Sequence, residues 1–89
     1  MTTKALRVSI VSPEKVLFDG EVRQVTLPGT MGVFSILPQH APIVSSLKAG
    51  TVSYVTAADG EERSLEVRGG FVEESANVVS VCVVVQAKP

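Results

Sequence analysis

The side chains that most often carry chemistry are scarce in this sequence. Its 89 residues include one cysteine, one histidine and no tryptophan. A single cysteine, Cys82, excludes an internal disulfide framework and is consistent with a reducing compartment. We interpret it as a small buried apolar residue rather than a reactive thiol. Because metal ligation needs several histidine, cysteine or carboxylate groups around one ion, Cys82 and His40 do not suffice, and we expect no metal and no cofactor.

Charge of one sign and long apolar runs are missing as well. Eight basic and nine acidic residues are interspersed along the chain, which is not the pattern of a protein that binds nucleic acid or an anionic membrane surface. No stretch approaches the roughly 18 consecutive apolar residues of a membrane-spanning helix. The start of the chain lacks the pattern of a secretory signal peptide. The length allows one small core, so we expect residues 1–89 to form a single globular domain without direct membrane insertion.

Valine dominates what is present. Seventeen valines stand against six leucines and seven alanines, and β-branched side chains favour strands over helices. Apolar residues alternate with polar ones around Leu6, Val8 and Ile10, and no segment shows a sustained helical period. Turn signals recur roughly every 8–12 residues, which predicts an all-β sandwich or barrel of about eight to ten short strands with almost no helix. The signals are SPEK at 12–15, FDGE at 18–21, LPGT at 27–30, LKAG at 47–50 and ADGE at 58–61.

Two strand regions allow more specific predictions. Asp59-Gly60 predicts a two-residue hairpin turn that pairs residues 51–57 with residues 61–68, since both residues tolerate positive φ. Val78–Val85 is apolar on both faces. We expect this strand to be covered on both sides, and a strand that awaits a partner is the alternative.

Two positions predict interruptions of regular strand. The apolar phase shifts by one residue between Val22 and Val25, which predicts a bulge near residues 23–24 because side chains in a strand alternate with a period of two. The Gly-Gly pair at 69–70 predicts a second bend or bulge, with close approach of a partner backbone as the lesser alternative.

One irregular run stands out in this strand-like chain. Residues 27–50 read LPGTMGVFSILPQHAPIVSSLKAG and contain three prolines, three glycines and the only histidine. His40 lies between two prolines that hold the backbone extended. Two interpretations stay open: a loop histidine that hydrogen-bonds its own turn, or a contact residue on a partner surface. Ser35, His40 and a carboxylate have no spacing that selects them as a catalytic set. The glycines match no phosphate-binding loop, so no nucleotide site is expected.

The order of residues across most of the chain resembles one family. Between about Val8 and Val81 the sequence is similar to the N-terminal domain of the epsilon subunit of rotary ATP synthases, called delta in mitochondria. The sequence departs from that family at Ser35 and Gln39, where glycine is usual, and at Val33, where an acidic residue is frequent. The most specific positions are Leu27-Pro28-Gly29, Gly32, Phe34, Ile36-Leu37-Pro38, His40-Ala41-Pro42, Gly50 and Gly69-Gly70-Phe71-Val72-Glu73.

The resemblance implies a flattened β-sandwich of two antiparallel sheets and a non-catalytic role in ATP synthesis and ion transport. Epsilon subunits bind gamma in the central stalk of the F-type enzyme and contact the ring of c subunits, whose rotation is driven by proton or sodium flow. Such subunits are peripheral, on the cytoplasmic face of the bacterial inner membrane or the equivalent stromal or matrix face. By resemblance, the interface with gamma and the c ring includes Met31, Gly32, Val33, Ser35, Gln39, His40, Ala41, Pro42, Gly69 and Gly70.

Two further expectations accompany this resemblance. Many epsilon subunits continue past the sandwich into a C-terminal helical hairpin that can inhibit ATP hydrolysis and in some of them binds ATP. This sequence ends in VVVQAKP, without helical periodicity and with Pro89 last, so we expect the helical hairpin, its inhibition of hydrolysis and ATP binding to be absent. Composition and turn spacing alone fit equally well a stand-alone β-sandwich module that binds another protein.

Overall fold

All regular structure in residues 5–85, the part that the computed structural model describes, is β-strand. No helix in this range is long and apolar enough to cross a membrane. The predicted all-β fold is confirmed, whereas Pro89 and the expectation about it lie outside the described residues. The strands are β1 (Leu6–Val11), β2 (Val16–Gly29), β3 (Gly32–Ile36), β4 (Ile43–Leu47), β5 (Gly50–Thr56), β6 (Glu62–Ser75) and β7 (Val78–Val85).

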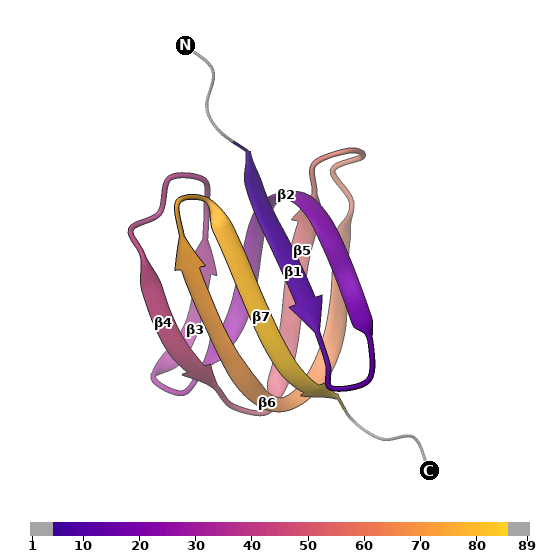
Figure 1. The fold of residues 1–89 in the computed structure, drawn as a ribbon, viewed down its shortest axis with the longest axis vertical. Helices are drawn as coiled ribbons and strands as arrows, with labels where there is room; N and C mark the ends of the chain where they lie inside the picture. The colour runs from indigo at the N-terminus through magenta and orange to yellow at the C-terminus, as the bar shows by residue number, and fades with distance from the viewer. Residues whose placement is uncertain (1–4, 86–89) are drawn as a thin grey trace.

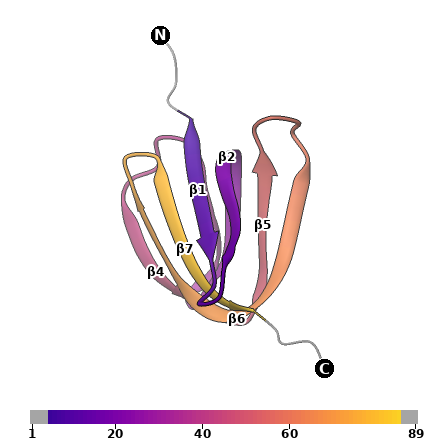
Figure 2. The ribbon, with the colours of Figure 1, turned by 45° about the vertical axis from the view of Figure 1, so that its right-hand side comes forward.

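The seven strands form one continuous sheet that folds into two layers (Figure 1). β1 pairs with β2 and β7, β7 with β6, β6 with β5, and β5 with β2, so hydrogen bonding closes a circuit of five strands. β4 joins the second half of β6, and β3 joins the second half of β2. Figure 2 shows β6 curving from the layer of β5 into the layer of β7 and β4. Closure of this kind leaves few unpaired edges.

The strands differ from the prediction in two details. β1 and β7 run parallel to one another, whereas the prediction had antiparallel sheets. β7 pairs antiparallel with β6 on its other side. The strands number seven, since β2 and β6 are each 14 residues long and pass through both layers. FDGE does not interrupt β2: Asp19 and Gly20 pair with Ser9 and Val8 of β1. The Asp19 carboxylate also lies 3.1 Å from the Arg7 guanidinium, so these turn-forming residues sit in regular strand.

Both predicted bulges are present where the long strands change layer. The pairing of β2 with β5 shifts register between Val22 and Gln24, and the pairing of β6 with β7 shifts between Val67 and Gly69. At the second corner Gly70 has a φ of +147°. A Cβ atom built on it would lie 2.1 Å from the Cys82 carbonyl oxygen. The close backbone approach at this glycine therefore occurs within the chain, between β6 and β7.

The core lies between the two layers and consists of the inward residues of alternating strand positions. Leu6, Val8 and Ile10 are fully buried, as their alternation predicts. Tyr54 belongs to the core, and its ring packs against that of the half-buried Phe18 with centroids 4.4 Å apart. Valine fills most of the remaining positions, because its short branched side chain packs well on a pleated surface. The other core residues are Val22, Val25, Leu27, Ile36, Leu47, Val52, Val67, Val72, Val79, Val81 and Val83.

β7 is covered on one face only, which corrects the expectation of a strand covered on both. Val81 on the inner face is fully buried, whereas Val78 and Val84 on the outer face are 52% exposed. Cys82 is half-buried on that outer face rather than fully buried. No strand among residues 5–85 packs over this side of β7, so its apolar residues form part of the surface.

The hairpin at Asp59 pairs the predicted strands but through a longer turn. Thr56 N donates to the Glu61 carbonyl at 3.0 Å and Gly60 N donates to the Thr56 carbonyl at 2.9 Å, which leaves a four-residue loop instead of two. The Asp59 carboxylate stabilises this loop. It accepts a hydrogen bond from the Thr56 hydroxyl and another, at 3.0 Å, from the backbone amide of Glu61. These hydrogen bonds, with the nearby Arg63 guanidinium, hold the pKa of Asp59 below its usual value. Side-chain capping thus overrides the two-residue turn chemistry.

Candidate partner-binding surface

An apolar groove runs between β3 and β4, beside the turn that joins β2 to β3. We call it the edge groove; its volume is about 380 Å³. Three of its side chains face solvent: Met31 is 97% exposed, Val33 70% and Val44 73%. None of its lining residues is charged, so a partner could bury them without desolvating an ion. The groove is lined by Gly29, Met31, Gly32, Val33, Phe34, Ile43, Val44 and Ser45.

Two glycines shape the turn at the end of this groove. Gly29 pairs with Gly32 across β2 and β3. A Cβ atom at Gly29 would lie 2.8 Å from both the Gly32 carbonyl oxygen and the Phe34 ring, so only glycine fits. Gly32 has a φ of +136° and open space around it, which makes it approachable from outside. The turn therefore presents Met31 and Val33 on a backbone that a partner can approach closely.

The inner side of the same hairpin belongs to the sandwich. Ile36 is fully buried, and Phe34 is half-buried against the core. The Ser35 hydroxyl lies 2.8 Å from the Thr26 hydroxyl on β2. Ser35, one of the predicted contact residues, is thus half-buried and engaged in pairing of the two strands.

The second group of predicted contact residues lies at the other end of β3. Residues 39–42 belong to the connection between β3 and β4, which begins about 13 Å from Gly32 if each strand residue advances roughly 3.3 Å. Ala41 and Pro42 are exposed, and His40 is half-buried. His40 N donates to the Leu37 carbonyl at 3.2 Å, and its Nδ1 lies 2.6 Å from the Ala41 carbonyl oxygen. The imidazole therefore hydrogen-bonds its own turn, as one of the two interpretations proposed.

Gly69 and Gly70 return to the end of the molecule that carries the β2–β3 turn. Leu47 of β4 pairs with Gly70 on one side and with Gly29 on the other. The predicted interface residues thus fall into two sets: residues 31–33 with Gly69 and Gly70 at one end, and residues 39–42 at the other. Ser35 lies between them in β3.

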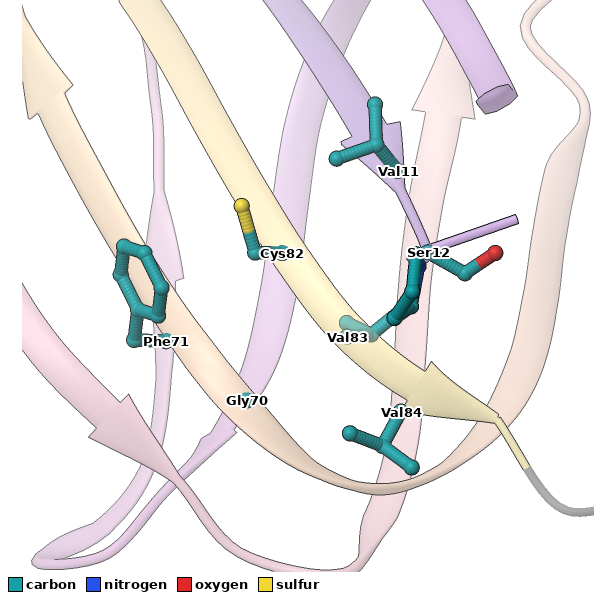
Figure 3. A pocket seen from close by; sticks show the side chains of 8 residues that line it. Val11, Ser12, Gly70, Phe71, Cys82, Val83 and Val84 are labelled. Carbon is teal, nitrogen blue, oxygen red and sulfur yellow. The ribbon is translucent and has the colours of Figure 1, made fainter. Parts of the chain in front are cut away.

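A second apolar pocket opens beside Gly70 on the outer face of β6 and β7. We call it the corner pocket; its volume is about 300 Å³. Figure 3 shows Phe71 projecting from β6 and Cys82 and Val84 from β7 around Gly70. Phe71 is 50% exposed. The lining residues are Val11, Ser12, Pro13, Gly70, Phe71, Cys82, Val83 and Val84.

Sequence reasoning missed one exposed member of each apolar surface. Val44 of the edge groove and Phe71 of the corner pocket were left out of the predicted interface. Val44 could have been found from the sequence. Ile43 and Val44 are adjacent in a strand and therefore point to opposite faces, so one of them is expected to be exposed. Phe71 follows the bulge at Gly69, which reverses the side of the strand on which it emerges, and that reversal is visible only once the register is known.

Within the described residues, no group of three or more histidine, cysteine or acidic side chains could hold a metal ion. What the surface offers is apolar, closely approachable backbone on a closed β-sandwich. The fold and this surface define the class of β-sandwich domains that carry an exposed apolar surface.

Comparison with known proteins narrows this class to one family. The family model for the ATP synthase delta/epsilon chain, β-sandwich domain, matches residues 5–87. The chain belongs to this family. The resemblance given by the motif order, from Leu27-Pro28-Gly29 to Gly69-Gly70, is therefore confirmed.

Curated relatives carry the name ATP synthase epsilon chain. One from Leptospira interrogans is 44% identical over 82 residues, which are 91% of this chain and 62% of the relative. One from Chlorobium limicola is 43% identical over 74 residues, 83% of each chain. The chain thus spans about three-fifths of the length of the Leptospira relatives and a larger share of the Chlorobium one.

Solved structures show the same fold at low sequence identity. A chain of the Euglena gracilis mitochondrial ATP synthase, in a structure of OSCP, F1 and c-ring, superposes with a TM-score of 0.84 at 17% identity. That match covers 94% of this chain and 54% of the other. A chain from the central stalk and c-ring structure of the Tetrahymena thermophila mitochondrial ATP synthase has a TM-score of 0.73 at 17% identity and covers 94% and 66%.

Proposed function

We propose that this chain is a non-catalytic central-stalk subunit of an F-type ATP synthase. In this role it binds gamma and the ring of c subunits, and it couples ion-driven rotation to ATP synthesis. The family match over residues 5–87 carries the proposal. The same match argues against a stand-alone module unrelated to ATP synthase. The subunit is then peripheral to the membrane, on the cytoplasmic face in bacteria or the stromal or matrix face in organelles.

The architecture suits transmission of torque. Hydrogen bonding through β1, β7, β6, β5 and β2 closes on itself, and the core between the layers is filled by side chains that are almost completely buried. A body of this kind resists shear because its layers cannot slide without breaking strand pairs and opening the packed core. A polypeptide of these 89 residues is proposed to couple rotation without a helical brake on ATP hydrolysis and without binding ATP.

The edge groove is the proposed docking surface. Its exposed apolar side chains and glycine-shaped turn combine apolar surface with close backbone approach, which favours association. The ten predicted contact residues remain a proposal, to which Val44 is now added because it is 73% exposed beside Val33 on the same groove.

A pair of matched variants tests this surface. Val44→Asp places a carboxylate in the edge groove, and Val16→Asp places one at a similarly exposed valine, 63% against 73%, at the start of β2. Titration calorimetry against a purified complex of gamma and the c ring should show binding by the parent chain. We expect Val44→Asp to weaken it tenfold or more, since an unpaired charge buried in an interface costs about 1–3 kcal/mol or more, and Val16→Asp to change it less than twofold. No binding by the parent would refute the proposed function, and equal binding by both variants would place the interface elsewhere.

A further inference from the structure

A buried carboxylate lies under the β3–β4 connection, where neither the core nor the strand pairing requires one. Glu74, near the end of β6, is 2% exposed, and its side chain is fully buried. Its Oε1 atom has no hydrogen-bond partner. Its Oε2 atom accepts only a long bond, 3.4 Å, from the Asn77 amide. A buried carboxylate without compensation is costly, so the surroundings of Glu74 indicate what compensates it.

The imidazole of His40 lies close to this carboxylate. Its Nδ1 lies 3.8 Å from Glu74 Oε1 and 2.6 Å from the Ala41 carbonyl oxygen. A carbonyl oxygen can only accept, so Nδ1 carries a hydrogen and donates it to Ala41. A small rotation of the imidazole would turn the same N–H toward Oε1. His40 therefore stands between an acceptor in its own turn and an acceptor in β6.

A second contact lies beside the first. The backbone N–H of Gln39 donates to Asn77 Oδ1 at 2.6 Å, a short bond to a buried side chain. Asn77 is in turn fixed by its own backbone, because its carbonyl accepts the Arg7 amide of β1 at 2.9 Å. The connection between β3 and β4 is thus tied at Gln39 to the turn between β6 and β7, and the adjacent His40 lies 3.8 Å from Glu74 near the end of β6.

Backbone strain is concentrated at this contact. Gln39, Ala76 and Asn77 have φ angles of +67°, +52° and +66°, and they are the non-glycine residues with positive φ within residues 5–85. Each such residue costs free energy and persists only where its surroundings fix it. The two turns that face one another here hold all of this strain.

We propose that Glu74 and Asn77 form a clasp that fixes residues 37–42 in one conformation for partner binding. Asn77 holds the Gln39 amide, and Glu74 acts through His40 as a positioning residue. The clasp keeps Ala41 and Pro42 exposed in a defined position rather than in a mobile connection. Its effect on partner affinity rests on the proposed function, whereas its effect on loop order does not.

Three variants separate the clasp from general stability. Glu74→Val replaces the buried carboxylate with an apolar side chain. Replacing a buried charged group in this way is often neutral or stabilising. Asn77→Gly removes only the side-chain acceptor and tolerates the positive φ. Glu62→Val, at an exposed position at the start of β6 where this strand pairs with β5, is the matched control.

Amide hydrogen exchange followed by NMR measures how well residues 37–42 are ordered. Calorimetry against the complex of gamma and the c ring measures the affinity for the partner. We expect Glu74→Val and Asn77→Gly to accelerate exchange at Gln39 and His40 roughly three- to tenfold, the equivalent of about one hydrogen bond. Partner binding should weaken by a similar factor. The melting temperature of Glu74→Val should not fall, and Glu62→Val should change neither exchange nor affinity.

Two results would overturn the proposal. Unchanged exchange at Gln39 and His40 in both clasp variants would show that Glu74 and Asn77 do not order the loop. Faster exchange with unchanged affinity would show that the ordered loop has no positioning role. Failure of the parent chain to bind gamma and the c ring would refute the proposed function instead, and the exchange rates would still decide whether the clasp exists.

Discussion

Replacing Gly70 by alanine tests the corner of β6 more sharply than any other single change. Gly70 and Gly32 both have positive φ, +147° and +136°, so alanine is strained at either position. At Gly32 nothing lies within 4 Å of the added methyl group. At Gly70 the methyl carbon would lie 2.1 Å from the Cys82 carbonyl oxygen and 2.9 Å from the Val83 Cα atom. Both atoms are backbone of β7, so relief requires the two strands to separate.

The two costs can be compared. Positive φ at a non-glycine residue costs about 1–3 kcal/mol, which is the whole expected effect of Gly32→Ala. Gly70→Ala adds an overlap of more than about 1 Å against a usual separation of roughly 3.5 Å, and overpacking of this kind costs about 1–3 kcal/mol or more. We therefore expect Gly70→Ala to lower the free energy of unfolding by about 2–6 kcal/mol. A chain of this size has a free energy of unfolding of roughly 4–13 kcal/mol in total, so the loss is a large fraction of its stability.

Urea denaturation followed by circular dichroism measures both variants against the parent. Gly32→Ala should shift the midpoint moderately and keep the slope of the parent. Gly70→Ala should lose at least about 1 kcal/mol more than Gly32→Ala, since the overlap is added to a similar backbone strain. Equal losses for the two variants would refute the claim that the contact with β7 requires glycine at the corner.

Three other changes test separate parts of the structure. Val81→Asp buries an unpaired carboxylate in the inner face of β7 and should destabilise the domain by about 3–5 kcal/mol; an unchanged melting temperature would mean that this side chain is not in the core. Asp59→Asn removes a carboxylate whose pKa is lowered in the folded state by the hydrogen bonds of its loop. The stability contributed by Asp59 is present above the pKa of the unfolded chain, roughly 4, and is lost as pH falls through the lower folded pKa. The difference in melting temperature between parent and variant should therefore shrink below about pH 4, and a constant difference would contradict the assignment. His40→Ala should weaken binding to gamma and the c ring by at most about 1 kcal/mol, the value of one hydrogen bond, whereas Ala41→Trp should obstruct docking; if the tryptophan variant binds like the parent in calorimetry, residues 39–42 are not in the interface.

The sequence alone predicts much of the fold because the signals are local and repeated. Alternation placed Leu6, Val8 and Ile10 on the buried face, and the phase shift after Val22 located a bulge that proves to be a corner. Strand number was overestimated because FDGE has turn composition. In the structure Asp19 lies in β2 and forms an ion pair with Arg7 of β1. Contacts between strands, rather than the turn composition of FDGE, therefore determine the conformation of these residues. The parallel pairing of β1 with β7 joins the two ends of the described chain and has no local signature at all.

The candidate surface was predictable only in part. Glycine and proline at residues 27–50 indicated an irregular, approachable segment, and Met31 and Val33 do line an apolar groove. Because residues 39–42 follow soon after Met31 and Val33 in the sequence, they were predicted to lie on the same surface. In the structure the length of β3 separates residues 31–33 from residues 39–42. The clasp was not predictable, because Glu74 stands between Glu73 and Ser75 in a polar run that is typical of an exposed strand end, and only the folded chain brings it 3.8 Å from His40. Contacts between residues far apart in sequence carry this part of the site.

The most direct test of the proposed role is reconstitution of epsilon-depleted ATP synthase with the 89-residue polypeptide. ATP hydrolysis and ATP-driven ion pumping would be measured together in sealed vesicles, with Val44→Asp and Val16→Asp as matched variants. The proposed role predicts that the parent chain and Val16→Asp restore pumping while hydrolysis stays uninhibited, and that Val44→Asp restores it poorly. Hydrolysis without any restored pumping by the parent chain would contradict a role in coupling, and strong inhibition of hydrolysis that ATP relieves would contradict coupling without a brake.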